Sequence, residues 1–172
     1  MEYLPLEQGL MSYHELEVLQ RQLNKAINAE DSSGEVLEIG AWKGQSTLAL
    51  AKYSKVITID PFVEGTFNDF TRNVNASTYK ENVELYKMTS DEYFSSHSPK
   101  LKFAFIDGSH VHPHPYKDIR NVWGRLNANG IMVVDDVNLP DVMKGIENNG
   151  LKDIMSVDWE RMKLGILAKA TH

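Results

Sequence analysis

The spacing of hydrophobic residues predicts an amphipathic helix at the start of the chain. Apolar residues recur at positions 16, 19, 23, 26 and 27, which lie on one face of a helix. Ser12 and Glu15 stand three residues apart just before this run, as in a capping box. We therefore expect a helix from Ser12 to about Glu30, within an N-terminal helical segment of residues 1–34.

From residue 35 onward, short apolar runs alternate with helical spacing. The sequence predicts strands at residues 35–39, 56–59, 83–87, 103–106 and 131–134. It predicts helices at residues 45–53, 116–126 and 141–148, and one within residues 62–82 that Thr66 caps together with Asp69. Asn129 and Gly130 are expected to stop the helix over 116–126. This alternation is typical of a parallel sheet with helices on both faces.

The end of the chain departs from this alternation. Residues 151–157 and 162–168 are predicted as two strands joined by a tight turn at Asp158-Trp159-Glu160. We therefore expect an α/β fold, a doubly wound and mostly parallel sheet that ends in an antiparallel hairpin. Residues 1–172 fit a single domain, with residues 35–172 as its α/β core.

Composition narrows the function classes. The chain has no cysteine, which excludes disulfides, a thiolate nucleophile and cysteine-bound metal centres. Its net charge is −6, with acidic residues spread along the sequence, so a small-molecule or glycan substrate is expected rather than nucleic acid. The sequence has no signal-like N-terminus and no apolar stretch of roughly 18 residues. We expect a cytoplasmic protein without a membrane partner.

A glycine-bounded loop follows the first predicted strand, where doubly wound sheets bind nucleotides. Dinucleotide-binding loops have a glycine against the pyrophosphate, but Trp42 occupies that position here, and the P-loop sequence is absent. S-adenosylmethionine (SAM) has no phosphate and needs a close turn with polar groups for its ammonium and ribose. Gly40 and Gly44 permit this turn, Glu38 lies beneath it, and Asp60 ends the next strand. Alternatively, the glycines only form a turn and the acids are solvated strand ends.

Three carboxylates are predicted to meet at the carboxyl edge of the sheet. Asp107 follows one strand, and Asp135 and Asp136 follow its neighbour, about 4.8 Å away. Oxygen ligands with room for water suit Mg²⁺ or another divalent cation, which would lower the pKa of an alcohol that attacks a methyl group. Alternatively, Asp135 and Asp136 cap the next helix.

The sequence resembles the class I SAM-dependent methyltransferases, and within them the macrocin-type sugar O-methyltransferases. The resemblance covers nearly the whole chain and is carried by residues 9–12, 36–47, 105–110 and 133–136. It implies that the methionine part of SAM is surrounded by Glu38, Gly40, Trp42, Gly44 and Ser46. It also implies that Asp60 binds the ribose, that Ser90 and Asp91 lie near the adenine, and that the three aspartates hold the metal. By the same resemblance, His110, three residues after Asp107, is the catalytic base.

Several of these residues have alternative interpretations. Ser90 and Asp91 fit a helix cap, and His110 fits a hydrogen-bonding role in its loop. A zinc site of His110, His112 and His114 is disfavoured, because prolines 113 and 115 should interrupt any helix and no cysteine is present. Core packing competes with a substrate pocket as the role of four aromatic residues, namely Phe62, Phe67, Phe70 and Trp159.

Three functions are compatible with the sequence. The leading hypothesis is Mg²⁺-assisted methyl transfer from SAM to a hydroxyl of a sugar or another hydroxylated small molecule. The second is a metal-independent SAM methyltransferase in which the catalytic residues His110 and Asp107 orient an oxygen or nitrogen nucleophile. The third is a non-catalytic SAM-fold binding module. A homo-oligomer in which a partner subunit closes the site is also compatible with the sequence.

Overall fold

The computed structural model describes residues 10–30, 32–158 and 163–170. Its α-helices are α1 (Tyr13–Ile27), α2 (Gln45–Ala51), α3 (Phe67–Ala76), α4 (Ser90–Ser96), α5 (His114–Arg125) and α6 (Pro140–Asn148). Its strands are β1 (Glu35–Ile39), β2 (Val56–Ile59), β3 (Val83–Tyr86), β4 (Leu101–Ile106), β5 (Leu126–Val134), β6 (Met155–Val157) and β7 (Gly165–Ala168). Short 3₁₀ turns at Lys80–Asn82 and Lys152–Ile154 precede β3 and β6.

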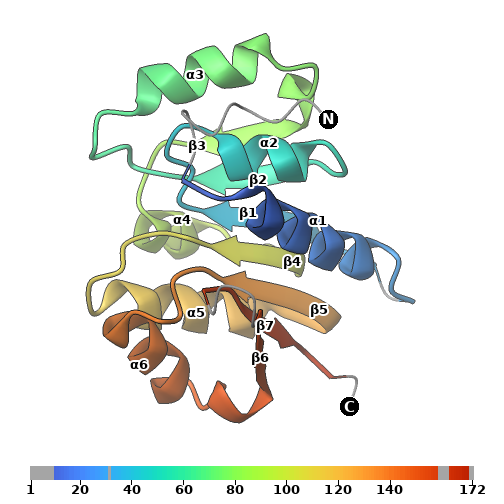
Figure 1. Cartoon of the computed structure of the whole chain (residues 1–172), viewed down its shortest axis with the longest axis vertical. Coiled ribbons are helices and arrows are strands. Elements are labelled where there is room, and N and C mark those ends of the chain that lie inside the picture. The colour runs from blue at the N-terminus through green and yellow to red at the C-terminus, as the bar shows by residue number, and fades with distance from the viewer. Residues whose placement is uncertain (1–9, 31, 159–162, 171–172) are drawn as a thin grey trace.

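All seven strands form one sheet in the order β3-β2-β1-β4-β5-β7-β6 (Figure 1). Strands β1 to β5 run parallel to one another, whereas β7 is antiparallel to both β5 and β6. The predicted doubly wound sheet with a terminal antiparallel hairpin is confirmed. Because β1 lies between β2 and β4, the loops after these strands meet at one edge of the sheet.

Helices cover both faces of the sheet. On one face, α1 and α2 pack over side chains such as Val36 and Phe103. On the other, α4, α5 and α6 pack over Leu37, Ala104 and their neighbours. Successive residues of β1 therefore enter different cores, and four of its five residues are buried. Burial on both sides explains why these strands are continuous apolar runs rather than alternating ones.

The N-terminal helix forms as predicted and is fixed near the carboxyl edge of the sheet. Ser12 and Glu15 form the expected capping box. The side chain of Gln45, the first residue of α2, accepts a hydrogen bond from Met11 N (3.0 Å) and donates one to Met11 O (3.1 Å). Because α2 begins at the carboxyl edge, this pair of bonds holds the start of α1 beside the loops that follow the strands.

The helix predicted over 116–126 is present as α5, but two expectations about its ends are wrong. The helix begins at His114, and Pro115 lies in its first turn, where no backbone N–H is required for an intrahelical bond. The expectation that this proline interrupts any helix therefore fails. The helix ends at Arg125, so Asn129 and Gly130 do not stop it but lie within β5. Asn129 has a positive φ of 63° there and pairs through its N–H with Lys169 O.

Smaller differences concern α3 and the terminal hairpin. Thr66 precedes α3 as expected, but its side chain makes no capping hydrogen bond to the described residues. The strand predicted over 151–157 is shortened by the 3₁₀ turn to β6, and the strand predicted over 162–168 begins at Gly165. Asp158 N donates to Leu164 O and extends the pairing of the hairpin. Trp159 and Glu160, which belong to the predicted turn, lie outside the described residues.

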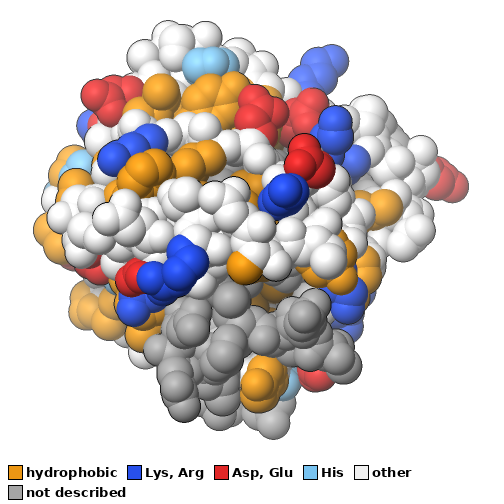
Figure 2. All heavy atoms as spheres, turned by 90° about the horizontal axis from the view of Figure 1, so that it is seen from above, with side chains coloured by type: hydrophobic (Ala, Val, Ile, Leu, Met, Phe, Trp, Pro, Cys, Tyr) orange, Lys and Arg blue, Asp and Glu red, His pale blue; other side chains and the backbone are white. Residues whose placement is uncertain are grey.

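The surface is of mixed charge where it is visible in Figure 2. On the side that carries α3, basic and acidic side chains are interspersed and do not form a patch of one sign. Within the described residues, no helix has the length and apolar character needed to cross a membrane.

Candidate active site

The loop from Gly40 to Gly44 makes a tight left-handed turn between β1 and α2. Gly40 and Gly44 have φ values of 90° and 91°, and Trp42 between them has a φ of 47°. A Cβ atom added to Gly40 would lie 2.0 Å from Asp107 O, so the loops after β1 and β4 touch at this point. A non-glycine residue with positive φ is strained, and such residues gather at functional sites.

Asp60 lies beneath this turn, at the end of β2. One oxygen of its carboxylate accepts hydrogen bonds from the backbone N–H groups of Ala41 (2.8 Å) and Trp42 (2.9 Å). The other accepts from Phe62 N (2.6 Å). Gly40 is also close, because its N–H donates to Ile59 O (2.9 Å). The proximity of Gly40 and Asp60 that the SAM interpretation requires is present, and Asp60 shapes the loop.

Glu38 is completely buried under the same loop. Its Oε2 accepts from the hydroxyls of Thr47 (2.5 Å) and Thr58 (3.0 Å), but Oε1 has no hydrogen-bond partner among the described residues. Burial raises the pKa of Glu38 to about 7, against the contrary effect of nearby hydroxyls that include Ser46. An unsatisfied carboxylate oxygen of this kind is complementary to a cationic donor.

The residues predicted near the adenine connect α4 to α5. Thr89, not Ser90 or Asp91, caps α4, so the capping interpretation applies one residue earlier. Ser90 Oγ donates to Asp118 Oδ1 (2.5 Å), and Asp91 pairs with Lys117 (2.6 Å). Burial raises the pKa of Asp118 to about 6. A role of Ser90 and Asp91 toward adenine stays a prediction.

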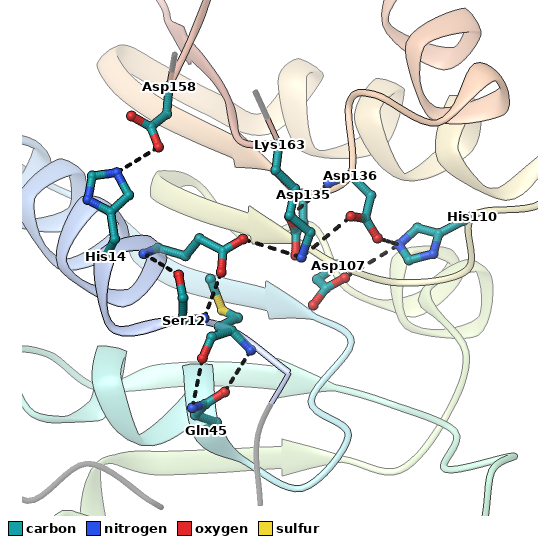
Figure 3. Close-up of polar contacts among 11 residues, drawn as sticks. Ser12, His14, Gln45, Asp107, His110, Asp135, Asp136, Asp158 and Lys163 are labelled. Carbon is teal, nitrogen blue, oxygen red and sulfur yellow. Dashed lines mark hydrogen bonds and ion pairs between the residues drawn. The ribbon is translucent and has the colours of Figure 1, made fainter. Parts of the chain in front are cut away.

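Asp107, His110 and Asp136 converge where β4 and β5 end (Figure 3). His110 Nε2 lies 3.4 Å from Asp107 Oδ1 and 3.3 Å from Asp136 Oδ2. One ligand atom from each residue lies within 4.8 Å of the others, and His110 Nε2 is buried without a hydrogen bond of good geometry to the described residues. Asp136 has a positive φ of 53°, which is a strained conformation at the site.

Asp135 belongs to a neighbouring ion-pair network that the sequence did not predict. Its Oδ2 accepts from Lys163 Nζ at 3.1 Å, and its Oδ1 accepts from Asp136 N at 2.8 Å. Lys163 also lies 3.4 Å from Asp136 Oδ1 and 3.5 Å from Glu15 Oε1. Lys163 therefore contacts both Asp135 and Asp136, and Asp136 faces His110 as well, together with Asp107 (Figure 3).

These contacts determine the ionisation of the cluster. Burial raises the pKa of Asp107, and it raises that of Asp135 to about 7 with a further contribution from Asp107. Interaction with Asp107 raises the pKa of His110, against its partial burial. Burial disfavours the charged form of Lys163, but Asp135, Glu15 and Asp136 together raise its pKa. Lys163 therefore carries a positive charge within this cluster.

The remaining predicted residues lie in the surrounding loops and in the core. His112 N donates to Asp141 Oδ2, and His114 begins α5; neither joins the cluster of candidate ligands found among the described residues. Phe62 packs against Phe67 and Phe70, with ring centroids 5.2 Å apart in each pair. These three rings serve core packing beside the glycine loop, and Trp159 lies outside the described residues.

A doubly wound sheet with a glycine turn after β1 and carboxylates after β4 and β5 defines the class I methyltransferase fold. The family model described as a methyltransferase domain matches residues 37–137, and the chain belongs to this family. The matched range includes the glycine loop, Asp60 and the whole Asp107–His110–Asp136 cluster. No curated protein matches the sequence.

Solved structures of O-methyltransferases have the same fold. An O-methyltransferase from Bacillus cereus, in complex with S-adenosylhomocysteine (SAH), is 14% identical, with a TM-score of 0.72 over 96% of this chain and 86% of that one. TomG from Streptomyces achromogenes, in complex with SAM, is 16% identical, with a TM-score of 0.70 over 95% and 82%. A TDP-rhamnose 3′-O-methyltransferase of calicheamicin biosynthesis is 13% identical, with a TM-score of 0.68 over 91% and 81%.

Proposed function

We propose that this protein transfers the methyl group of SAM to a hydroxyl group of a sugar or another hydroxylated small molecule, with the help of Mg²⁺ or another divalent cation. The observation that carries the proposal is the convergence of Asp107, His110 and Asp136 directly beside the glycine turn. The turn and the cluster meet where Gly40 touches Asp107, so a methyl donor and an acceptor would be neighbours.

The residues around the turn fit SAM. Oε1 of Glu38, which has no hydrogen-bond partner in the described part of the chain, is a buried acceptor for the ammonium of the methionine part, and a cation there would favour the ionised carboxylate. The same loop and the first turn of α2 contain the other predicted residues, Gly40, Trp42, Gly44 and Ser46. Asp60 accepts three backbone hydrogen bonds, which leaves its carboxylate further acceptor capacity for a ribose hydroxyl.

The cluster also fits a divalent cation. Two carboxylate oxygens and the imidazole nitrogen of His110 are suitable ligands, and the unsatisfied Nε2 lacks a better partner among the described residues. The ion would be held by Asp107, His110 and Asp136. Asp135 would contribute indirectly, because it accepts a hydrogen bond from the backbone N–H of Asp136. The chemistry that a bound divalent cation supplies is a lower pKa of the acceptor hydroxyl.

The chain's own residues orient the acceptor and accept its proton. With an ion on His110 Nε2, the second carboxylate oxygen of Asp107 would take the proton as the acceptor oxygen bonds to the methyl carbon and the carbon–sulfur bond of SAM breaks. Without an ion, His110 would take that proton. Asp107 and Asp136 lie on either side of the imidazole, so they orient it and stabilise its protonated form. The buried core behind β4 and β5 keeps these groups at fixed positions, which is what alignment of oxygen, methyl and sulfur requires.

The acceptor class is inferred from the site and supported by the fold. The site offers an imidazole and two carboxylates to a hydroxyl, and one structural neighbour is a TDP-rhamnose 3′-O-methyltransferase. The chain is not expected to bind nucleic acid; homo-oligomer formation and a cytoplasmic location remain predictions.

The test is SAH formation with a panel of sugar nucleotides, monosaccharides and catechols as acceptors. We expect turnover with at least one hydroxylated acceptor, stimulation by Mg²⁺ or Mn²⁺, and loss of activity in EDTA. Replacement of His110 by Ala should lower kcat by roughly 10²- to 10⁴-fold without loss of SAM binding. Failure of the wild-type protein to bind SAM in calorimetry would rule the proposal out.

A second candidate is a SAM methyltransferase that needs no metal, and Lys163 favours it. The ammonium group already supplies a positive charge next to Asp135 and Asp136. If this candidate is correct, EDTA leaves turnover unchanged, and the Asp136→Ala substitution changes turnover very little. A severe loss of activity in that variant would count against it.

A further inference from the structure

Lys163 enters the carboxylate cluster from a distant part of the chain. It lies in the connection between β6 and β7, and its Nζ is within 3.5 Å of carboxylates from α1 (Glu15) and from the end of β5 (Asp135 and Asp136). Three-quarters of its side chain is buried, since 25% is exposed. Figure 3 shows Lys163 beside Asp135 and Asp136.

Asp135 is held by this lysine at a depth where an unpaired charge is costly. Only 1% of its side chain is exposed, and both carboxylate oxygens have partners, Asp136 N and Lys163 Nζ. A buried carboxylate that loses its counter-ion is strongly destabilised. Asp135 can therefore turn toward another cation only if Lys163 is displaced or neutralised.

Asp136 is the link between the two parts of the cluster. Its Oδ2 faces His110 at 3.3 Å, while its Oδ1 faces Lys163 at 3.4 Å. Any cation bound through Asp136 therefore shares that carboxylate with the lysine ammonium. Two positive charges on one partly buried carboxylate repel each other, because the local dielectric screens them poorly.

We propose that Lys163 is a built-in counter-cation that keeps Asp135 out of the metal site and competes with a divalent ion bound by Asp107, His110 and Asp136. The inference rests on the proposed function, whose metal-binding residues it specifies further. It makes the donor set two carboxylates and one imidazole, which suits Mn²⁺ or Zn²⁺ better than Mg²⁺. Lys163 thus sets the affinity and the selectivity of the site.

The central experiment measures Mn²⁺ binding by calorimetry and by the electron paramagnetic resonance of free Mn²⁺. In Lys163→Gln the amide can still donate to Asp135, but the competing charge is gone. We expect this variant to bind Mn²⁺ about tenfold more tightly than the wild type, the size that loss of one nearby, partly screened charge implies. Equal or weaker binding overturns the proposal.

Lys169→Gln is the matched control. Lys169 also lies beside β7, but its Nζ donates to the backbone carbonyls of Trp123 and Leu126 rather than to carboxylates. This variant changes the net charge by the same amount, so its Mn²⁺ affinity should equal that of the wild type. An equal gain in both variants would show a general charge effect and would overturn a specific role of Lys163.

A measurement on the wild-type protein keeps the proposal testable if Lys163→Gln does not fold. Limited acetylation with peptide mass spectrometry reports how accessible each lysine is. Mn²⁺ should increase the labelling of Lys163 about threefold or more, because the ion displaces the ammonium from its carboxylates, and should leave Lys169 unchanged. Unchanged or reduced labelling of Lys163 overturns the proposal.

The same samples separate failure of this inference from failure of the proposed function. SAM is titrated into the wild-type protein and both variants before the metal. If SAM binds but no form binds Mn²⁺, the inference and the metal part of the function are lost, and SAM-dependent methyl transfer stands. If SAM does not bind to the wild type, the methyltransferase proposal itself falls.

Discussion

At the scale of single residues, the site combines buried charge with strained backbone. Glu38 is completely buried with one carboxylate oxygen unpaired among the described residues, and Trp42 and Asp136 have positive φ values. Such features lower stability and persist where the surrounding structure enforces them. Substitution of Glu38 should therefore stabilise the folded protein but weaken the binding of SAM.

Glu38→Gln should remove a pH-dependent loss of stability. The pKa of Glu38 is raised to about 7, so the folded protein holds a proton that the unfolded chain releases near pH 4.5. Because the folded state binds more protons in this window, stability falls as pH rises from about 4.5 to about 7. Urea unfolding should show the variant about 2–3 kcal/mol more stable than the wild type at pH 8 and about equal to it at pH 4.

The exposed Glu64 provides the control for this comparison. Glu64→Gln removes one carboxylate from the same protein without touching the glycine loop, and its stability curve should run parallel to that of the wild type. If the difference between Glu38→Gln and the wild type were the same at pH 4 and pH 8, the buried carboxylate would not be the origin of the pH dependence.

Gly40→Ala should disrupt the contact between the loops after β1 and β4. The added Cβ would lie 2.0 Å from Asp107 O, and the φ of 90° disfavours any side chain. We expect a loss of roughly 2–4 kcal/mol in unfolding free energy together with loss of SAM binding. Gly124 lies in α5, and no atom of the described residues is within 4 Å of a Cβ added there, so Gly124→Ala should instead stabilise the protein by about 0.5–1 kcal/mol.

At the scale of elements, the sequence was sufficient where local patterns determine structure. The capping box of α1 and the strands β1 to β3 follow from hydrophobic spacing and turn residues, and they form as predicted. The start of α5 and the extent of β5 were mispredicted, because Pro115 is tolerated in a first turn and Asn129 adopts a positive φ within a strand. The local sequence is compatible with a helix or an interruption at Pro115 and with a strand or a turn at Asn129. Contacts with distant parts of the chain decide which of these forms.

The site was predicted in part for the same reason. Asp107 and Asp136 converge because the ends of neighbouring parallel strands meet, which follows from topology. Lys163 and Glu15 join them through contacts between residues that are remote in sequence, and no local spacing marks such a contact. Lys163 reaches Asp135 because β7, which follows it, pairs with β5.

Substitution of Gln45 tests how the start of α1 is held in place. Its side chain makes two hydrogen bonds with the backbone of Met11, and both partners are buried. Gln45→Met keeps the volume but removes both bonds. Hydrogen exchange should show faster exchange of the Met11 amide by about tenfold, with the amides of β1 and β4 unchanged. Uniformly faster exchange would indicate global destabilisation instead of local release of α1.

At the scale of the whole molecule, two regions compete as ligand sites. A groove of about 600 Å³ opens between α1 and the end of α2, and Tyr53 contributes to it. Tyr53 precedes β2, so this groove is near the amino edge of the sheet. The glycine turn, Asp60 and the His110 cluster are at the opposite edge, which is where ligands bind in open α/β sheets. The size of the groove thus favours a ligand site at the amino edge of the sheet, whereas the chemistry of the side chains favours the carboxyl edge.

Hydrogen exchange with and without SAM decides between the two edges. We expect slower exchange in residues 40–44, 60–66 and 107–112, because these loops surround the turn and the cluster, and unchanged exchange in residues 52–55 and 97–100 at the amino edge. Glu38→Gln is the matched control, since it keeps the fold but lacks the carboxylate that would face the ammonium, so protection should be reduced at the same SAM concentration. Protection around Tyr53 that persists in this variant would place SAM in the groove beside α1 and would separate its binding site from the acidic cluster.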